Sequence, residues 1–240
     1  MSNDQNLDPL DLVVYTRAFA VLLSAGVPLV RILDILADVA DEPLRSATVE
    51  MRKGICESNR TLSAEMRERP MLFTTMYAAL VRAGEVGGVL DESLERAADA
   101  LEADWADAQV TGTPFRSLLH PSREEAGFSD SAPDEQLHIL AEYFGSLALM
   151  LISGVPIVQA LETAAEVFPP GPEQEVLIAA PERIKHGESL GDLLRLPFLP
   201  TYVSTLFKIG EQTHTVDTMC QKVAQLLEHQ RRYHLLKQAQ

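Results

Sequence analysis

The chain has 240 residues and a formal net charge of −15 at pH 7, and 46% of its residues are hydrophobic. That hydrophobic share is enough to build buried cores, so the composition excludes a chain that is disordered throughout. The negative charge, which no basic stripe offsets, argues against a nucleic-acid-binding protein and against unassisted binding to an anionic membrane surface.

The first helix is predicted from its start signals. The segment MSNDQNLDPLD is polar and acidic, unlike a signal peptide. Asp8 offers an N-cap acceptor and Pro9 suits a first helical turn, so we expect a helix from there to about Ala25. Residues at helical spacing predict one apolar stripe along it, made of Leu10, Val13, Val14, Arg17, Ala20 and Val21.

A turn is predicted where the chain reads SAGVPLV, at residues 24–30. Gly26 can close a helix in the left-handed conformation, and Pro28 pre-sets the backbone for the next helix. We therefore expect a tight corner between two antiparallel helices. Further helices are predicted at about 29–40, 43–55, 62–69, 73–83 and 90–105, with Thr61 as N-cap of the fourth and Gly84 ending the fifth.

A similar sequence motif recurs in the second half of the chain. ISGVPIV at 152–158 places Gly154 and Pro156 where the first copy has Gly26 and Pro28. A shift of 128 residues also aligns TLSAEM (61–66) with SLGDLL (189–194), and a shift of 126 aligns RAGEVGGVLD (82–91) with KIGEQTHTVD (208–217). Three landmarks in one order predict an internal duplication. Helices are expected at 136–152, 156–167, 173–186, 190–195, 200–209 and 216–235, with Ser189 as the counterpart of the N-cap Thr61 and Gly210 closing the fifth of them.

These patterns predict an all-α fold of two tandem six-helix bundles, residues 9–106 and 136–235. Between them, residues 107–135 are rich in Gly, Pro, Ser and acidic residues and are expected to form a flexible linker. Such a linker keeps the bundles close, so a pseudo-dimer of the two domains is one expectation, and a homodimer is another. The apolar run at residues 143–158, which contains Gly145, Gly154 and Pro156, is expected to form a buried helix followed by a corner and not a membrane span.

Catalytic patterns are missing from the sequence. GEVGG at 84–88 lacks the Lys-Ser/Thr ending and the preceding strand of a phosphate-binding loop. The histidines have no zinc-site spacing, and Cys56 and Cys220 are expected to be reduced, buried and inert. We expect no catalytic residue, no cofactor and no enzyme activity. An enzyme site hidden between the two copies is kept as a further hypothesis.

Four acidic residues occupy equivalent places in the two copies. Glu85 and Glu211 follow the glycines of the fifth helices, and Asp91 and Asp217 begin the sixth. Capping is one interpretation, because acids favour helix N-termini. A partner-docking corner is the other, or a weak calcium site at Glu85 and Asp91, although two acids alone are too few ligands.

The order of these motifs resembles the F-type domain of type II secretion systems, which also occurs in the platform protein of type IV pili. The resemblance covers about residues 9–106 and 136–235, and copy two lacks the glycine after the glutamate. The matching residues of copy one are Gly26, Pro28, Leu29, Leu33, Leu62, Phe73, Gly84, Glu85, Gly88, Leu90, Asp91 and Leu94; those of copy two are Gly154, Pro156, Leu161, Gly187, Ser189, Leu190, Gly210, Glu211 and Asp217.

The resemblance implies tandem cytoplasmic six-helix domains of an inner-membrane platform, which connect an assembly ATPase to pilin or pseudopilin polymerisation without catalysis of their own. Family members carry two membrane helices between the domains and a third after them, whereas here a polar linker takes the first place and HQRRYHLLKQAQ, residues 229–240, takes the other. We expect a cytoplasmic protein, peripheral at the inner membrane through partners, that docks on the ATPase or another platform component. The alternative is a generic soluble helical adaptor derived from the same family.

Overall fold

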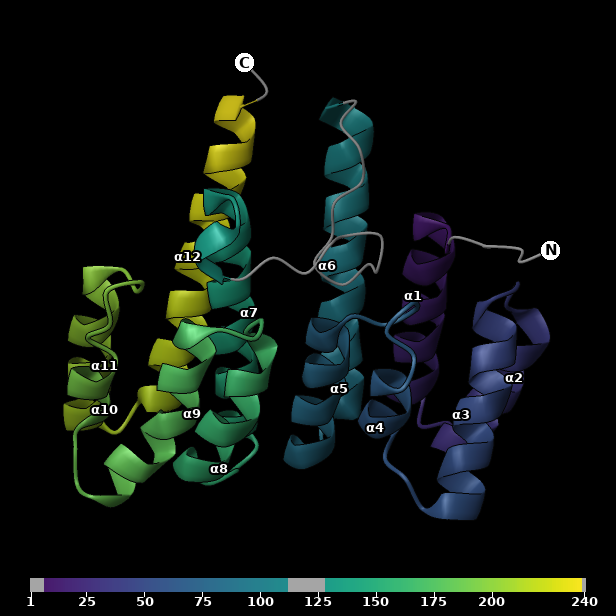
Figure 1. Ribbon diagram of the computed structural model, residues 1–240, viewed down its shortest axis with the longest axis horizontal. Coiled ribbons are helices and arrows are strands. Elements are labelled where there is room, and N and C mark those ends of the chain that lie inside the picture. Colours follow the sequence, from purple (N-terminus) through teal and green to yellow (C-terminus); the bar gives the residue numbers. More distant parts are fainter. Residues whose placement is uncertain (1–6, 112–127, 239–240) are drawn as a thin grey trace. The chain divides into compact units, whose positions relative to one another are not determined.

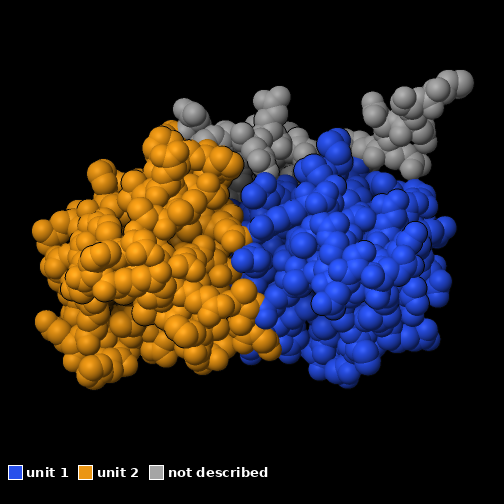
Figure 2. Space-filling model, turned by 60° about the horizontal axis from the view of Figure 1, so that its bottom comes forward, with its two compact units in different colours: residues 1–85, 89–124 blue, residues 86–88, 125–240 orange. Residues whose placement is uncertain are grey.

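The computed structural model describes residues 7–111 and 128–238 (Figure 1). Within these ranges the chain forms α-helices and two short 3-10 turns and contains no strand. The helices belong to two compact units, coloured separately in Figure 2, with α1–α6 in unit 1 and α7–α12 in unit 2; Val86–Gly88, at the end of α5, group with unit 2. The predicted all-α fold of two tandem six-helix bundles is confirmed.

Each unit repeats the same order of helices. Unit 1 consists of α1 (Pro9–Ser24), α2 (Leu29–Val39), α3 (Leu44–Ser58), α4 (Leu62–Arg67), α5 (Thr75–Gly87) and α6 (Leu90–Thr111). Unit 2 consists of a 3-10 turn (Phe128–Asp130), α7 (Pro133–Ile152), α8 (Ile157–Ala164) followed by a 3-10 turn (Ala165–Val167), α9 (Pro172–Lys185), α10 (Leu190–Leu193), α11 (Thr201–Thr213) and α12 (Val216–Gln238). The first and last helices of each unit pack on one another, α1 on α6 and α7 on α12.

Side chains begin the helices where the sequence predicts. The carboxylate of Asp8 accepts a hydrogen bond from the Leu10 N–H at 2.9 Å, with Pro9 as the first helical residue. Thr61 caps α4 by accepting from the Ala64 N–H at 3.3 Å. Ser189 does the same for α10, accepting from the Asp192 N–H at 3.1 Å. These hydroxyl and carboxylate oxygens satisfy amide groups that a helix leaves without partners at its start.

The corners between the first two helices of each unit have one geometry. Gly26 has a φ of +75° and Gly154 a φ of +83°, the left-handed conformation that the sequence analysis expects there. The Val27 N–H donates to the Leu22 carbonyl at 3.1 Å, and the equivalent bond in unit 2 is 2.9 Å. Pro28 and Pro156 then open α2 and α8. Glycine is needed because a side chain makes this conformation costly.

The apolar stripe predicted along α1 is wrong in part. Val13 and Ala20 are buried, but Leu10, Val14 and Val21 are exposed. The buried face instead contains Leu12, Val13, Tyr15, Thr16, Phe19 and Ala20. Apolar residues occur on all sides of this helix, so periodicity alone did not identify the side that packs against α6 and the aromatic core.

The predicted ends of the fifth helices are also wrong. Gly84 and Gly210 lie inside α5 and α11, which continue to Gly87 and Thr213. A Cβ at Gly84 would lie 2.6 Å from Cβ of Ser93, and one at Gly210 would lie 2.8 Å from Cγ of Met219. These glycines therefore allow the close approach of α6 and α12. The left-handed residues that end the helices are Gly88, with a φ of +69°, and His214, with a φ of +56°.

The linker is shorter than the predicted range of 107–135. Helix α6 continues to Thr111, and α7 begins at Pro133 after the 3-10 turn at Phe128–Asp130. The remaining part, residues 112–127, lies outside the described residues. None of the helices in the described ranges combines the length and the hydropathy that crossing a bilayer requires.

Candidate functional site

A glutamate from the fifth helix holds the start of the fourth. In unit 1, Oε1 of Glu85 accepts a hydrogen bond from the Leu62 N–H at 2.7 Å, and Oε2 accepts one from the Ser63 hydroxyl at 2.5 Å. Leu62 and Ser63 are the first residues of α4. The carboxylate thus meets the positive end of a short helix, where charge-assisted hydrogen bonds are strong.

Unit 2 repeats this contact with its own residues. Oε1 of Glu211 accepts from the Leu190 N–H at 2.5 Å, and Oε2 accepts from the Gly191 N–H at 3.2 Å. Gly191 stands where unit 1 has Ser63, whose backbone N–H also donates to Oε1 of Glu85 at 3.4 Å, so unit 2 keeps the two amide contacts and lacks the hydroxyl contact. We call this contact of Glu85 or Glu211 with the start of α4 or α10 the glutamate latch.

The glutamate latch shows that Glu85 and Glu211 cap the fourth helix of each unit. Glu85 and Glu211 precede the sixth helices in sequence, but they bind α4 and α10, which lie more than 20 residues earlier in the chain. Asp91 and Asp217 do lie in the first turns of α6 and α12, where the helix dipole favours a negative charge. Docking of a partner on these four acids stays a prediction.

Calcium binding by Glu85 and Asp91 also stays a prediction, and the geometry gives it no support. Both carboxylate oxygens of Glu85 already accept hydrogen bonds from α4. Among the described residues, no group of three or more His, Cys, Asp or Glu side chains is placed to hold a metal ion. A calcium ion needs six to eight oxygen ligands.

The cysteines have different surroundings. Cys220 is buried, and burial raises the pKa of its thiol, which keeps it protonated and unreactive. Cys56 is exposed on α3, so the expectation that it is buried is wrong. It lies in the last turn of α3, three residues before Asn59, where the chain leaves the helix. Both cysteines are free thiols.

Each core tyrosine of unit 1 forms a hydrogen bond with a threonine hydroxyl. The Tyr15 and Thr48 hydroxyls lie 2.8 Å apart, and those of Thr16 and Tyr77 lie 2.9 Å apart. Burial raises the pKa of both phenols, so each stays neutral and serves as a hydrogen-bonding group. These contacts tie α1 to α3 and α5, and nothing in them points to proton transfer.

A surface that the sequence analysis did not single out lies along α1 and α6. The exposed apolar residues Leu10, Val14 and Val21 of α1 run beside acidic residues of α6. Arg17 links the two helices through ion pairs to Asp99 at 2.5 Å and Glu102 at 2.6 Å. In the sequence, the signal for an exposed stripe is the charged residue Arg17, which stands between Val14 and Val21 at helical spacing.

Comparison with known proteins assigns a family to both units. The model of the family described as type II secretion system (T2SS), protein F, matches residues 15–111 and 143–240. A type IV pilus assembly protein PilC of Myxococcus xanthus is 26% identical over 290 aligned positions, which cover 89% of this chain and 70% of that protein. A PilC of Thermus thermophilus is also 26% identical, with 91% and 72% covered.

A shorter match is found with a type II secretion system protein F of Xanthomonas campestris, which is 32% identical over 115 residues, 48% of this chain and 28% of that protein. The alignment with the Myxococcus protein has 290 positions, more than the 240 residues of this chain. That relative therefore contains, between the matched parts, residues without counterparts here.

Proposed function

Because the chain belongs to the type II secretion system protein F family, we propose that it is a non-catalytic docking protein in the assembly of a type IV pilus or a type II secretion system. The observation that carries the proposal is the double match, in which each unit corresponds to one copy of the family domain. The relatives named for pilus assembly and for type II secretion both match, so the proposal covers the two systems.

The proposed partners are the assembly ATPase or other platform components, and the proposed location is the cytoplasm, at the inner membrane through those partners. The latch supports a structural role for Glu85 and Glu211, because their carboxylates are occupied by α4 and α10. Asp91 and Asp217 are the docking residues that we propose. They start the sixth helices and are only half-buried, which leaves them open to a partner's cation.

The test is recovery of partners from the native cells. The tagged full chain is purified under mild conditions and co-purifying proteins are identified by mass spectrometry. We expect enrichment of a pilus or secretion ATPase or platform component. The double variant Asp91→Asn and Asp217→Asn is expected to recover less of that partner, whereas Asp38→Asn, an exposed aspartate on α2, is expected to recover as much as wild type.

A second candidate is the generic helical adaptor of the same descent. It is favoured by the alignment with the Myxococcus protein, since a chain that lacks an internal part of its relative can serve another process. Reproducible enrichment of proteins from an unrelated process, with no secretion or pilus component among them, would replace the first proposal by this one.

A further inference from the structure

Unit 1 exposes a row of apolar residues on α1. Leu10, Val14 and Val21 follow one another at helical spacing, with Arg17 between the last two, so they lie along one side of the helix. Val14 is 59% exposed and Val21 57%, although valine is a residue that usually lies inside. The described residues of unit 1 therefore leave much of this row open to solvent.

An acidic row on α6 borders it. Glu92, Glu95, Asp99 and Glu102 are spaced by three, four and three residues and thus share one face of α6. Arg17 reaches from the α1 row to Asp99 and Glu102, which fixes the two rows side by side. We call these seven residues, three apolar and four acidic, the α1–α6 surface.

Unit 2 lacks this surface. The positions of Leu10 and Val21 are taken there by His138 and Leu149, which are both buried, and the position of Val14 is taken by Glu142. A different face is exposed on α12, whose residues Lys222, Leu226, His229, Tyr233 and Lys237 repeat at steps of three and four. We call these five residues the α12 face.

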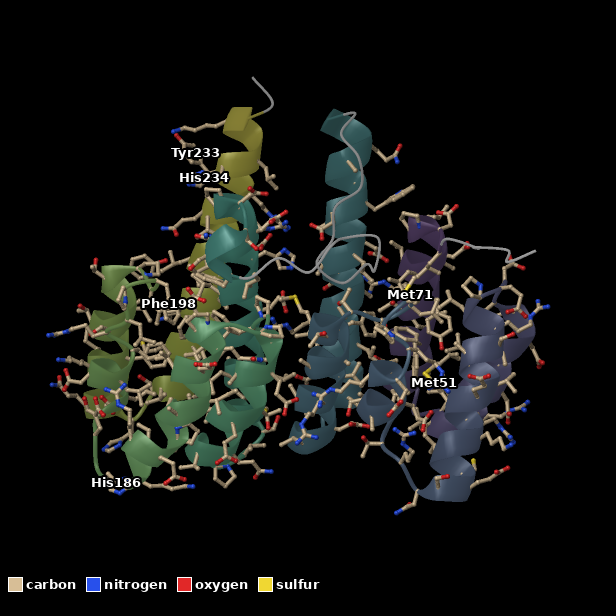
Figure 3. The ribbon with its side chains drawn as sticks, viewed as in Figure 1. Met51, Met71, His186, Phe198, Tyr233 and His234 are labelled. Carbon is tan, nitrogen blue, oxygen red and sulfur yellow. The ribbon has the colours of Figure 1, made fainter. Side chains whose placement is uncertain are left out.

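The α12 face is apolar and basic. Tyr233, near the end of α12 (Figure 3), is 59% exposed, and Leu226 is 44% exposed. The ammonium of Lys237 lies 4.6 Å from the centre of the Tyr233 ring. Helix α12 occupies in unit 2 the place of α6 in unit 1, so the duplicated helices have diverged to opposite charge.

We propose that the α12 face of one copy docks on the α1–α6 surface of a second copy. A helix with an apolar row fits against another apolar row, and the lysines of α12 then meet the acidic row of α6. Because the two surfaces differ, each copy keeps one of them unused. Association therefore continues beyond the dimer or closes into a ring. This contact does not depend on which secretion or pilus component the chain serves.

The first experiment is sedimentation velocity of the purified full chain over a range of protein concentrations. We expect the average mass of the sedimenting species to rise with protein concentration at low ionic strength and to fall when salt is added. The reason is that the Debye screening length falls to about 3 Å in 1 M salt. A chain that stays monomeric at every concentration overturns the proposal.

Matched variants locate the contact. Val14→Arg puts a cation in the α1 row, and Tyr233→Asp puts an anion in the α12 face. Each is expected to weaken self-association by about tenfold or more, as loss of a central contact does. The controls are Val49→Arg, at a residue 54% exposed on α3, and Ile178→Asp, at one 55% exposed on α9; both are expected to associate as wild type. Equal circular dichroism spectra establish that all four variants fold.

Mixing decides between unlike and like surfaces. The Val14→Arg chain keeps an intact α12 face, and the Tyr233→Asp chain keeps an intact α1–α6 surface. Together they are expected to form a dimer of one copy each and to stop there. Controls that weaken association as much as the test variants, or a mixture that stays monomeric, overturn the proposal.

Discussion

The two units share their backbone geometry and differ in their interiors. Both turn at a left-handed glycine, and both fix a short helix with the glutamate latch. Inside unit 1, Tyr77 is bonded to Thr16, whereas unit 2 has Val203 and Phe144 in those places. A buried Glu65 pairs with Arg69 at 2.9 Å in unit 1, and Leu193 replaces that glutamate in unit 2. The difference teaches that turns and helix caps have constrained the repeat more than core chemistry has.

The largest expected effect comes from filling the helix contacts at Gly84 and Gly210. Gly84→Leu is expected to lower the free energy of unfolding by about 3 kcal/mol, because overpacking forces α5 and α6 apart. Gly210→Leu is expected to cost less, since the atom in the way belongs to the flexible Met219 side chain rather than to Cβ of Ser93 and the α6 backbone. Denaturant unfolding of unit 1 is followed by the fluorescence of Trp105, the single tryptophan, and that of unit 2 by hydrogen exchange. Equal losses would show that the two contacts do not differ.

The latch is expected to matter next. Glu85→Ala should cost about 2 to 3 kcal/mol, because it removes charge-assisted hydrogen bonds and leaves the Leu62 amide unpaired. Glu211→Ala is expected to cost slightly less, since Glu211 has no hydroxyl partner like Ser63. The Ser63→Gly variant, which copies unit 2, should bring the two losses together. Amide exchange in α4 and α10 measures each loss separately, and unchanged exchange rates in the alanine variants would refute the assignment.

The corners at Gly26 and Gly154 are expected to lose equal stability when the glycine is replaced. Gly26→Val and Gly154→Val should each cost about 1 to 2 kcal/mol, because a β-branched residue resists positive φ. No atom lies within 4 Å of a Cβ built at either glycine, so backbone strain is the whole effect and the two losses should be equal. Denaturant midpoints that match wild type would show that these corners tolerate a side chain.

The tyrosines separate the two cores. Tyr77→Phe is expected to cost about 1 kcal/mol, since the buried Thr16 hydroxyl loses its partner. Tyr143 lies in unit 2 where unit 1 has Tyr15, but its buried hydroxyl has no hydrogen-bond partner among the described residues. Tyr143→Phe is therefore expected to be neutral or slightly stabilising. Thermal unfolding of the two variants beside wild type is the measurement, and a clear loss for Tyr143→Phe would contradict this account.

The smallest effect concerns pH. The Arg17 guanidinium, through its hydrogen bonds, holds the pKa of Glu102 below its ordinary value of 4.5. A lowered folded-state pKa stabilises the fold above the unfolded value, and that stabilisation is lost as pH falls through the folded pKa. The pair is partly exposed, so the loss in unit 1 should be below about 1 kcal/mol. Arg17→Met should abolish this acid dependence, whereas unit 2, with Gly145 in that place, should lack it.

Local signals predicted much of this fold. Gly26 with Pro28, and their repeat at Gly154 and Pro156, identified the corners because glycine and proline act on their own backbone. The caps Asp8, Thr61 and Ser189 were equally readable, since each acts within three residues. In contrast, Gly84 carries no sign that it serves α6 rather than a helix end.

Tertiary contacts accounted for what the sequence did not predict. The latch joins Glu85 to the amide of Leu62, 23 residues away, so the residues next to either one do not predict the contact. On α1, Leu10, Val14 and Val21 are as apolar as the residues that the core buries. The positions of the helices that pack on α1 decide which side is covered, and periodicity carries no information about them.

The shortness of α4 and α10 has a consequence for how the protein opens. A helix of six or four residues does not persist alone, because nucleating a helix costs more than so few bonds return. Each therefore depends on contacts with the rest of its unit, among them the carboxylate that α5 or α11 presents. We expect the members of each pair to expose their amides to solvent together, as one cooperative unit. A partner that binds one helix of such a pair would then slow amide hydrogen exchange in both helices.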